Sequence, residues 1–305
     1  ARGAREVVLL DNYSLGSPDV LGELANHPRV RVVRGDILQT RDLFDAFADT
    51  DGVFAIAGFL TLPMAQNPVL GLSGNITGHA NVMEVCRYRG VKRVVFASST
   101  AVYGEPLQEP MTEDTAFDWA RFQPAAAMYS ASKIIGENLC RHYHNRHGIG
   151  SLSLRYGTVY GERQHYRGVN ALYIMENYDR IRRGERPVIP GDGKEVHDYI
   201  HVSDVARANV MAMDSDIAGE SLNVVSGVAT TLNEVICTLL RVMGSHLEPE
   251  FRTAKDLTRV SVGTHLAFDR QKIRRLLGWQ PLVGLEEGIR RLASWRERHD
   301  AAAIA

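Results

Sequence analysis

Short apolar runs alternate with stretches of helical spacing through the first half of the chain. The runs predict strands at 6–12, 30–37, 52–58 and 151–156, and another at 91–96 that leads directly into Ser99. Between them, apolar residues three and four positions apart predict helices at 42–47 and 75–89, with a further helix carrying Tyr129. Strands that alternate with helices as far as Tyr156 predict an α/β fold with a doubly wound parallel sheet.

The second half of the chain has a looser pattern. Residues 171–183 have the spacing of an amphipathic helix, and 188–193 are typical of a strand and turn. The stretch from Gly104 to Pro124 is rich in proline and acidic residues, which predicts a long loop that is either one wall of a cleft or a solvated connector.

Composition excludes several classes of protein. The chain has 305 residues, of which 45% are hydrophobic, and a formal net charge of −1, so no basic field recruits nucleic acid or an anionic membrane. No apolar run approaches the ~20 residues that span a bilayer, and no secretory signal opens the chain. The three cysteines are far apart in sequence, which argues against a disulfide framework and against a metal site. We therefore expect a cytoplasmic protein that binds no metal.

Candidate chemistry centres on Tyr129 and Lys133. Positions four apart lie on one face of a helix, so the phenol and the ammonium project side by side. A neighbouring ammonium favours the phenolate, and we expect it to lower the pKa of Tyr129. Ser99, at the end of a buried strand, is placed to hold a substrate hydroxyl or carbonyl against that phenol. Alone, this spacing is also that of a surface helix pair, and the strand with Ser98-Ser99-Thr100-Ala101-Val102-Tyr103-Gly104 makes the catalytic interpretation stronger.

Taken together, these motifs resemble the extended short-chain dehydrogenase/reductase family, in particular the NAD-dependent epimerases and dehydratases similar to UDP-glucose 4-epimerase. The resemblance implies a Rossmann-type NAD-binding domain over 1–156. It implies that 157–305 is mostly a smaller α/β substrate-binding domain, with some segments returning to the first. The strand and capped helix at 197–206 and the closing helices from 268 to 288 fit this resemblance.

The resemblance assigns the roles at the catalytic centre and the cofactor site. Tyr129 is the acid/base, Lys133 lowers its pKa and bonds the nicotinamide ribose, and Ser99 orients the reacting hydroxyl. Asp11, at the end of a strand, accepts hydrogen bonds from the adenine ribose, which favours NAD over NADP. Further cofactor-binding positions are Asn12, Asp36, Ile37, Ala57, Gly58, Asn75 and Tyr156.

The glycine-rich turn that such a fold places between its first strand and helix is absent from the sequence. The cluster at 71–74 follows no clear strand and does not replace it. We expect that the chain as written lacks one strand–turn–helix unit. No residues of the sequence can therefore be assigned to the binding of the NAD pyrophosphate.

On the substrate side, the residues after Ser99 favour a 4-epimerase. Family dehydratases carry an acidic pair where this chain has Thr100 and Ala101, and Thr100 is placed to share the role of Ser99. Four more positions are expected to bind substrate: Thr158, Asn170, His197 and Arg259. Thr158 and His197 stand where relatives have Asn and Arg, and His is not an equivalent phosphate ligand.

Two other functions stay open. One is an NAD-dependent dehydrogenase of a small alcohol, sugar or sugar acid, and the other is a non-catalytic dinucleotide-binding protein. The resemblance also implies a homodimer through a four-helix bundle formed by the helices near Asn75 and Tyr129. An apolar stripe of Ile134, Ile135, Leu139 and Tyr143 is available for it, or for packing on the sheet.

Overall fold

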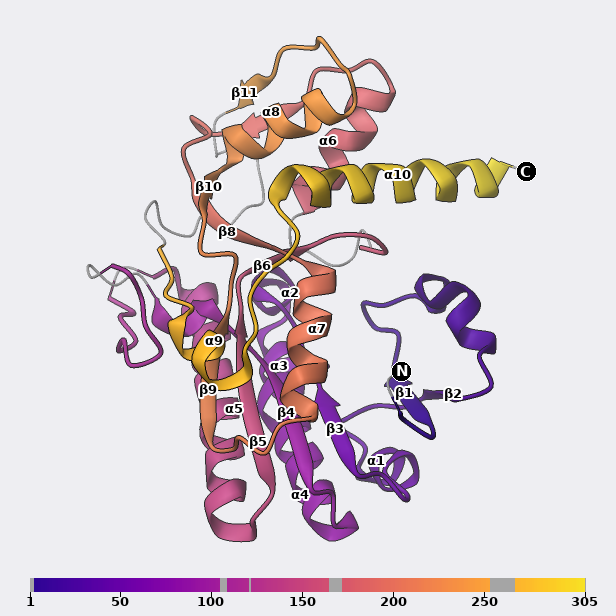
Figure 1. The fold of residues 1–305 in the computed structure, drawn as a ribbon, viewed down its shortest axis with the longest axis vertical. Helices are drawn as coiled ribbons and strands as arrows, with labels where there is room; N and C mark the ends of the chain where they lie inside the picture. The colour runs from indigo at the N-terminus through magenta and orange to yellow at the C-terminus, as the bar shows by residue number, and fades with distance from the viewer. Residues whose placement is uncertain (1–2, 105–108, 121, 165–171, 253–266, 305) are drawn as a thin grey trace.

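A four-stranded parallel sheet forms the centre of the larger, lower part of the molecule in the computed structural model (Figure 1). The structure describes residues 3–104, 109–120, 122–164, 172–252 and 267–304. The sheet has the order β3-β4-β5-β9, with strands β3 (Gly52–Ala55), β4 (Arg93–Ser99), β5 (Gly150–Tyr156) and β9 (Glu220–Val224). All three pairings are parallel, so the strands end at the same edge, where Ser99 lies opposite Tyr156.

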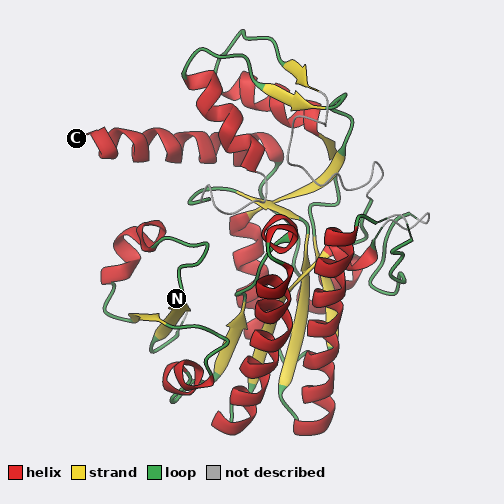
Figure 2. Ribbon diagram, turned by 180° about the vertical axis from the view of Figure 1, so that it is seen from behind, coloured by secondary structure: helices red, strands yellow, loops and turns green. Residues whose placement is uncertain are grey.

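The buried strands of this sheet have helices on both faces. On β4, Val94 and Phe96 point into one apolar cluster, and Val95 points into another, as the two-residue period of a strand requires. The first cluster is covered by α1 (Thr40–Ala46), α4 (His79–Arg89) and α5 (Pro124–His147), and the second by α7 (Val202–Met213) and α9 (Gln271–Leu277). Figure 2 shows these layers from behind. The doubly wound parallel sheet expected from the sequence is therefore confirmed.

A separate pair of parallel strands lies beyond β3. Strand β1 (Val7–Asp11) pairs with β2 (Val30–Arg34), with Val7 opposite Val30. This pair shares no ladder with the four-stranded sheet within the described residues, yet Val8 and Leu10 pack against the cluster beneath α1 and α4. The segment η1 (Pro18–Asn26) follows β1.

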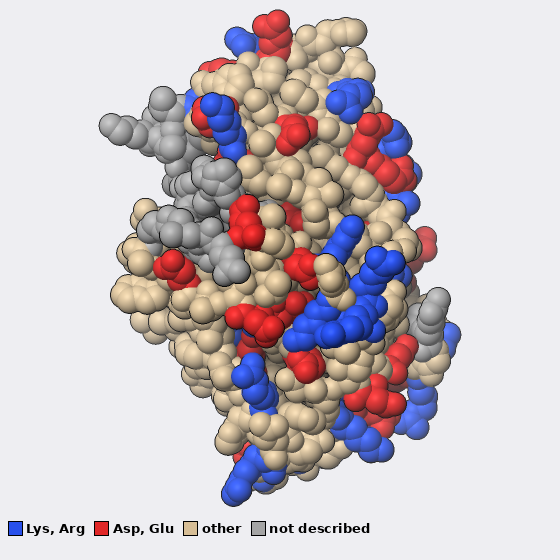
Figure 3. Space-filling model, turned by 60° about the vertical axis from the view of Figure 1, so that its left-hand side comes forward, with Lys and Arg blue, Asp and Glu red and all other residues tan. Residues whose placement is uncertain are grey.

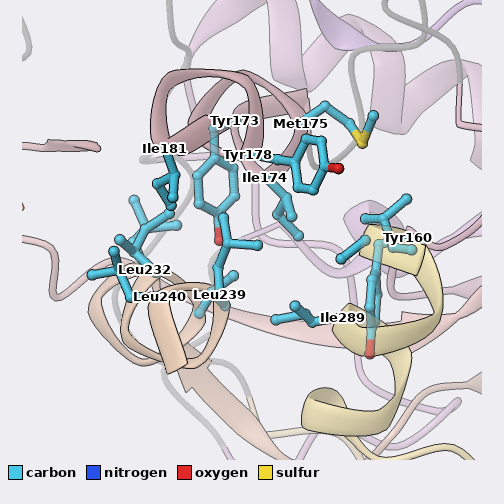
Figure 4. Packing of buried hydrophobic residues seen from close by; sticks show 14 of the residues in the cluster. Tyr160, Tyr173, Ile174, Met175, Tyr178, Ile181, Leu232, Leu239, Leu240 and Ile289 are labelled. Carbon is cyan, nitrogen blue, oxygen red and sulfur yellow. The ribbon is translucent and has the colours of Figure 1, made fainter. Parts of the chain in front are cut away.

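The smaller, upper part of the molecule is built from residues of the second half of the chain (Figure 1). Its core is a cluster between α6 (Leu172–Arg182), α8 (Leu232–Val242) and α10 (Leu285–Ile304), which includes Tyr173, Ile174 and Ile289 (Figure 4). Short strands complete it: β6 (Thr158–Tyr160), β7 (Val188–Pro190), β8 (Val196–His201), β10 (Ala229–Thr231) and β11 (Glu250–Arg252).

The remaining elements are short. Helices α2 (Thr61–Gln66) and α3 (Pro68–Leu72) lead into a π-helical turn, η2 (Ser73–Gly78), before α4, and η3 (Thr100–Tyr103) follows β4. The sequence pattern predicted one continuous helix from 75 to 89, and it missed α2, α3, α8 and β9. Strand β9 follows a break in the alternation, so nothing local indicated that it returns to the main sheet beside β5.

Acidic and basic side chains lie next to one another on the face shown in Figure 3, as expected from a net charge near zero. None of the described helices combines the length and the apolar character needed to cross a membrane.

Candidate active site

The carboxyl end of β4 carries the first part of the site. Its last residue, Ser99, accepts a hydrogen bond from the Ala101 backbone N–H at 3.2 Å, which caps η3. The hydroxyl of Thr100 donates to the Tyr156 carbonyl at 3.2 Å. Ser99 is therefore fixed at the point where the strand turns away, which is the edge where ligands bind in open α/β sheets.

Helix α5 supplies Tyr129 and Lys133. It starts with Pro124 in its first turn and ends at His147, directly before Gly148, whose φ of 70° suits a residue without a side chain. Tyr129 and Lys133 are each 7% exposed and face the sheet, where Ser99 forms a side-chain hydrogen bond with the phenol. The structure thus brings together the three residues that the sequence predicts as catalytic.

Lys133 is held by the strand next to Ser99. Its Nζ donates to the Ala97 carbonyl at 2.8 Å and lies 5.8 Å from the centroid of the Tyr129 ring. It also lies 5.2 Å from the centroid of Phe96, whose ring stacks on His79 at 4.2 Å. Burial lowers the pKa of Lys133 to about 8.

The pKa of Tyr129 differs from the sequence expectation. We expected the Lys133 ammonium to lower it, but burial raises the pKa of Tyr129, and the hydrogen bond with Ser99 only partly opposes that rise. The physical reason is that a buried phenolate loses its hydration, and Lys133 directs its hydrogen bond to Ala97 rather than to the phenol.

Beside Lys133, the backbone at Gly58 passes close to Asn75. A side chain at Gly58 would lie 2.9 Å from Asn75 Oδ1 and 3.6 Å from Lys133 Nζ. Asn75 fixes this turn, since its Oδ1 accepts from the Phe59 N–H at 2.7 Å and its Nδ2 donates to Ser132 Oγ on α5 at 3.1 Å. Ala57 and Gly58 are exposed. The backbone at Gly58 is therefore open to a ligand that also reaches Lys133.

The end of β1 and the residues directly after β1 and β2 carry four more of the predicted cofactor residues. Asp11 is exposed and accepts from the Tyr13 N–H at 2.7 Å, while the amide of Asn12 donates to Asp36 at 3.0 Å. The carbonyl of Ile37 accepts from Asn81 at 3.0 Å. The hydrogen bond between Asn12 and Asp36 joins the segments that follow the two strands, and the carboxylate of Asp11 stays exposed.

Tyr156 lies on the other side of the sheet. Its hydroxyl donates to Asn209 on α7 at 2.9 Å, and burial raises its pKa to about 12. The Tyr156 phenol is thus directed toward α7 and not toward Tyr129.

Two of the predicted substrate residues lie on the short strands above the sheet. Thr158 is on β6, which pairs with β8, and His197 is on β8 itself. The Nε2 of His197 lies 2.7 Å from Glu195 Oε1. Asn170 and Arg259 lie outside the described residues.

Asp198 is a buried acid that the sequence analysis did not single out. It accepts hydrogen bonds from the N–H groups of Ser226 at 2.6 Å and Gly227 at 2.7 Å, and burial raises its pKa to about 6. A side chain at Gly157 would lie 2.8 Å from its carbonyl oxygen. An aspartate inside an otherwise buried strand was the sequence signal for this structural link between β8 and the end of β9.

The histidines at the end of α5 face solvent or the backbone. His142 and His147 are exposed, and His144 Nδ1 lies 3.2 Å from the Ile149 carbonyl. Among the residues that the structure describes, no group of three or more His, Cys, Asp or Glu side chains is arranged to hold a metal ion.

Comparison with known sequences identifies the family to which this fold and this site belong. A sequence model of the NAD dependent epimerase/dehydratase family matches residues 1–225, and the chain belongs to that family. The chain is 31% identical over 299 residues to a putative UDP-glucose 4-epimerase of Methanocaldococcus jannaschii, covering 97% of this chain and 92% of the relative.

Two further similarities point the same way. A UDP-glucose 4-epimerase of Mycolicibacterium smegmatis is 30% identical over 289 residues, covering 93% of this chain and 88% of the relative. Among solved structures, UDP-N-acetylglucosamine 4-epimerase from Methanobrevibacter ruminantium, in complex with UDP-N-acetylmuramic acid, superposes with a TM-score of 0.86 at 27% identity. That superposition covers 96% of this chain and 91% of the other. The chain is thus an NAD-dependent enzyme of the extended short-chain dehydrogenase/reductase type.

The residues present fit NAD. The hydroxyls of a nicotinamide ribose need hydrogen-bond donors, and Lys133 Nζ is one. The exposed backbone at Gly58 leaves room beside it, because a side chain there would lie against Asn75 and Lys133. An adenine ribose needs a hydrogen-bond acceptor, and the exposed carboxylate of Asp11 is one.

Proposed function

We propose that this protein is a nucleotide-sugar 4-epimerase that acts by reversible hydride transfer at a sugar carbon. The observation that carries the proposal is the hydrogen bond between Ser99 and the Tyr129 phenol at the carboxyl edge of the sheet, with Lys133 fixed beside them on Ala97. UDP-sugar 4-epimerases among the relatives support the reaction and the substrate class.

Each catalytic residue has a defined task in this reaction. Bound NAD supplies the carbon that accepts a hydride and later returns it. Ser99 holds the reacting sugar hydroxyl, and Tyr129 takes its proton and gives it back to the opposite epimer. Lys133 bonds the nicotinamide ribose and presents a positive charge on the same helix face as Tyr129. Ala101 carries no acid, so the chain has no group there to expel water from the keto sugar.

We further propose that Thr100, Thr158 and His197 line the substrate side, with Asn170 and Arg259 completing it. Asp11, Asn12, Asp36 and Ile37 bind the adenosine half of NAD. Ala57, Gly58, Asn75 and the backbone of Tyr156 lie along the nicotinamide half. We propose a cofactor domain over 1–156, with 157–305 mostly a substrate domain from which α7, β9 and α9 return to the first. The boundary is supported by β6 starting at Thr158, two residues after β5 ends.

The direct test incubates the full-length protein with NAD and UDP-glucose, and in parallel with UDP-N-acetylglucosamine, and separates the sugars by chromatography. We expect the 4-epimer of at least one substrate to accumulate to equilibrium, with no net change in NADH absorbance. Absence of any epimer from both substrates contradicts the proposal.

A dehydrogenase of a small alcohol, sugar or sugar acid is the second candidate. The observation that favours it is the pairing of His197 with Glu195, because a carboxylate at 2.7 Å offsets the positive charge that a substrate phosphate would need. Net NADH formation in the same assay distinguishes this candidate, because an epimerase returns its hydride in every cycle.

We propose a homodimer formed through α4 and α5. Of the four stripe residues, Ile135 is 40% exposed, whereas Tyr143 is tied to Glu84 on α4 by a hydrogen bond of 2.7 Å. Tyr88 on α4 and Val69 on α3 are also exposed, at 63% and 78%.

We also propose a cytoplasmic location, which is supported by three cysteines that form no disulfide.

A further inference from the structure

A buried carboxylate behind the catalytic residues has no task in the reaction described above. Glu137 lies one helical turn after Lys133 on α5 and is 5% exposed. Burial acts to raise its pKa, but the hydrogen bonds and charge of Arg155 prevail, and the pKa of Glu137 lies below its usual value. The side chain is thus a charged group inside the protein, directly beneath the catalytic edge.

Glu137 accepts hydrogen bonds from three neighbouring strands. Ser98 on β4 donates to Oε1 at 2.5 Å, and Ser221 on β9 donates to Oε2 at 2.9 Å. Arg155 on β5 donates to both oxygens, from Nε at 2.8 Å and from Nη2 at 2.7 Å. Bidentate pairs of this kind constrain geometry more than single hydrogen bonds do.

The strand residues involved are the immediate neighbours of the site. Ser98 precedes Ser99 on β4, and Ala97, the residue before it, accepts the hydrogen bond from Lys133. Arg155 also donates to the Tyr103 hydroxyl at 2.9 Å and to the Glu113 carbonyl at 3.0 Å, which ties in the segments that follow Ser99.

Helix α5 packs directly on β4. A side chain at Gly136 would come within 2.3 Å of the Phe96 ring, so only glycine allows this approach. Sliding α5 along the sheet would therefore break the four hydrogen bonds of Glu137 and force Phe96 aside.

We propose that Glu137 is a positioning residue for catalysis: through Ser98 and Arg155 it fixes α5 against β4 and thereby sets the hydrogen bond between Tyr129 and Ser99. The proposal rests on the proposed function for its kinetic consequences, but not for the geometry itself. Glu137 touches no reacting atom in this arrangement, and its effect passes through the two elements that it joins.

The test compares Glu137→Gln and Ser98→Ala with Asp204→Asn in the full-length protein. Asp204 is a matched control on α7, because it is also a buried carboxylate with an arginine partner, Arg207, and accepts from the Leu282 and Val283 N–H groups. Glutamine cannot accept from Arg155 and both serines as the carboxylate does. Ser98→Ala removes only one of the hydrogen bonds to Glu137. If Glu137→Gln does not fold, the Ser98→Ala protein by itself tests whether Glu137 positions the catalytic residues.

The first readout needs no reaction. Fluorotyrosine at position 129 titrates at lower pH than tyrosine, and fluorine NMR of the free protein follows its ionisation. We expect Glu137→Gln and Ser98→Ala to move that titration to higher pH, because a loosened hydrogen bond with Ser99 stabilises the phenolate less. The Asp204→Asn protein should titrate like the parent, although it melts at a lower temperature.

The second readout is kinetic, with UDP-glucose as substrate. Displacement of a catalytic group by about 1 Å can slow a reaction by about 100-fold, and we expect kcat to fall about 10- to 100-fold in Glu137→Gln with little change in KM. The acid limb of the kcat profile should shift to higher pH with it. If both variants lose thermal stability but keep the parent titration of residue 129, as Asp204→Asn does, Glu137 is structural only and the proposal fails. If no epimerisation is found, the fluorine titration still decides the role of Glu137.

Discussion

At the scale of single residues, burial acts on Tyr129 and Lys133 in opposite directions. It raises the pKa of the phenol and lowers that of the ammonium to about 8, because each group loses hydration in its charged form. Burial therefore disfavours the charged form of both groups, but an ammonium with a pKa of about 8 still carries its charge at neutral pH.

Tyr129→Phe tests the acid/base assignment. The ring and its packing stay, but the proton acceptor is lost, so we expect kcat to fall by about 10²–10⁴-fold. NAD affinity, measured by calorimetry, should change little, because Lys133 and Asp11 remain. Full activity in the variant would show that another group moves the proton, and the mechanism would have to be reassigned.

His79 gives a prediction about stability and pH. It is buried against Phe96, and burial with the nearby charge of Lys133 lowers its pKa from 6.5 to about 3. Above pH 6.5 His79 is neutral in both the folded and the unfolded state. Between pH 6.5 and about 3 it is protonated in the unfolded state but stays neutral in the folded state. Its contribution to stability is therefore present above pH 6.5 and is lost as the pH falls toward 3.

The comparison of the parent with His79→Phe isolates this effect, because Asp198 titrates in both proteins. The difference between their free energies of unfolding, from urea titrations between about pH 6.5 and 5, should change by up to about 1.4 kcal/mol per pH unit. Parallel stability curves for the two proteins would show that His79 is protonated when folded.

At the scale of elements, close approach fixes α5 on β4. Gly136→Ala would place a methyl group 2.3 Å from the Phe96 ring, and overpacking of this kind typically costs about 1–3 kcal/mol. We expect a lower midpoint in urea unfolding, despite the better helix propensity of alanine. Gly284→Ala is the control, because nothing lies within 4 Å of the added atom, and its midpoint should match the parent. Equal midpoints for both variants would contradict the packing argument.

Element prediction from the sequence succeeded where the local pattern was complete. Strands β4 and β5 are apolar runs, and α5 combines a first-turn proline with a glycine directly after its end, so these elements and the proximity of Ser99, Tyr129 and Lys133 were predictable. The pairing of β9 with β5 joins residues about 70 positions apart and has no local signal. The partners of Glu137 come from three strands, and that is why their role emerged only from the structure.

At the scale of the whole molecule, the proposed dimer makes a prediction about Ile135. A charged side chain in an apolar helix interface stays uncompensated, so Ile135→Arg should shift light scattering from dimer to monomer. Val228→Arg replaces a similarly exposed residue, 59% against 40%, away from α4 and α5, and should leave the mass unchanged. A parent protein that is monomeric at low micromolar concentration rules out the dimer.

The return of β9, α7 and α9 to the main sheet has a consequence for any attempt to divide the gene. A fragment ending at Tyr156 would keep Val95, Leu152 and Leu154. It would lose Leu222 on the neighbouring strand β9, and Val205 and Ile273 on the helices that cover this face. The apolar side chains on one face of its sheet would then be exposed to solvent. The edge of β5 that pairs with β9 would also be free to pair with other chains. Such a fragment should collect in inclusion bodies, even though it contains Ser99, Tyr129 and Lys133.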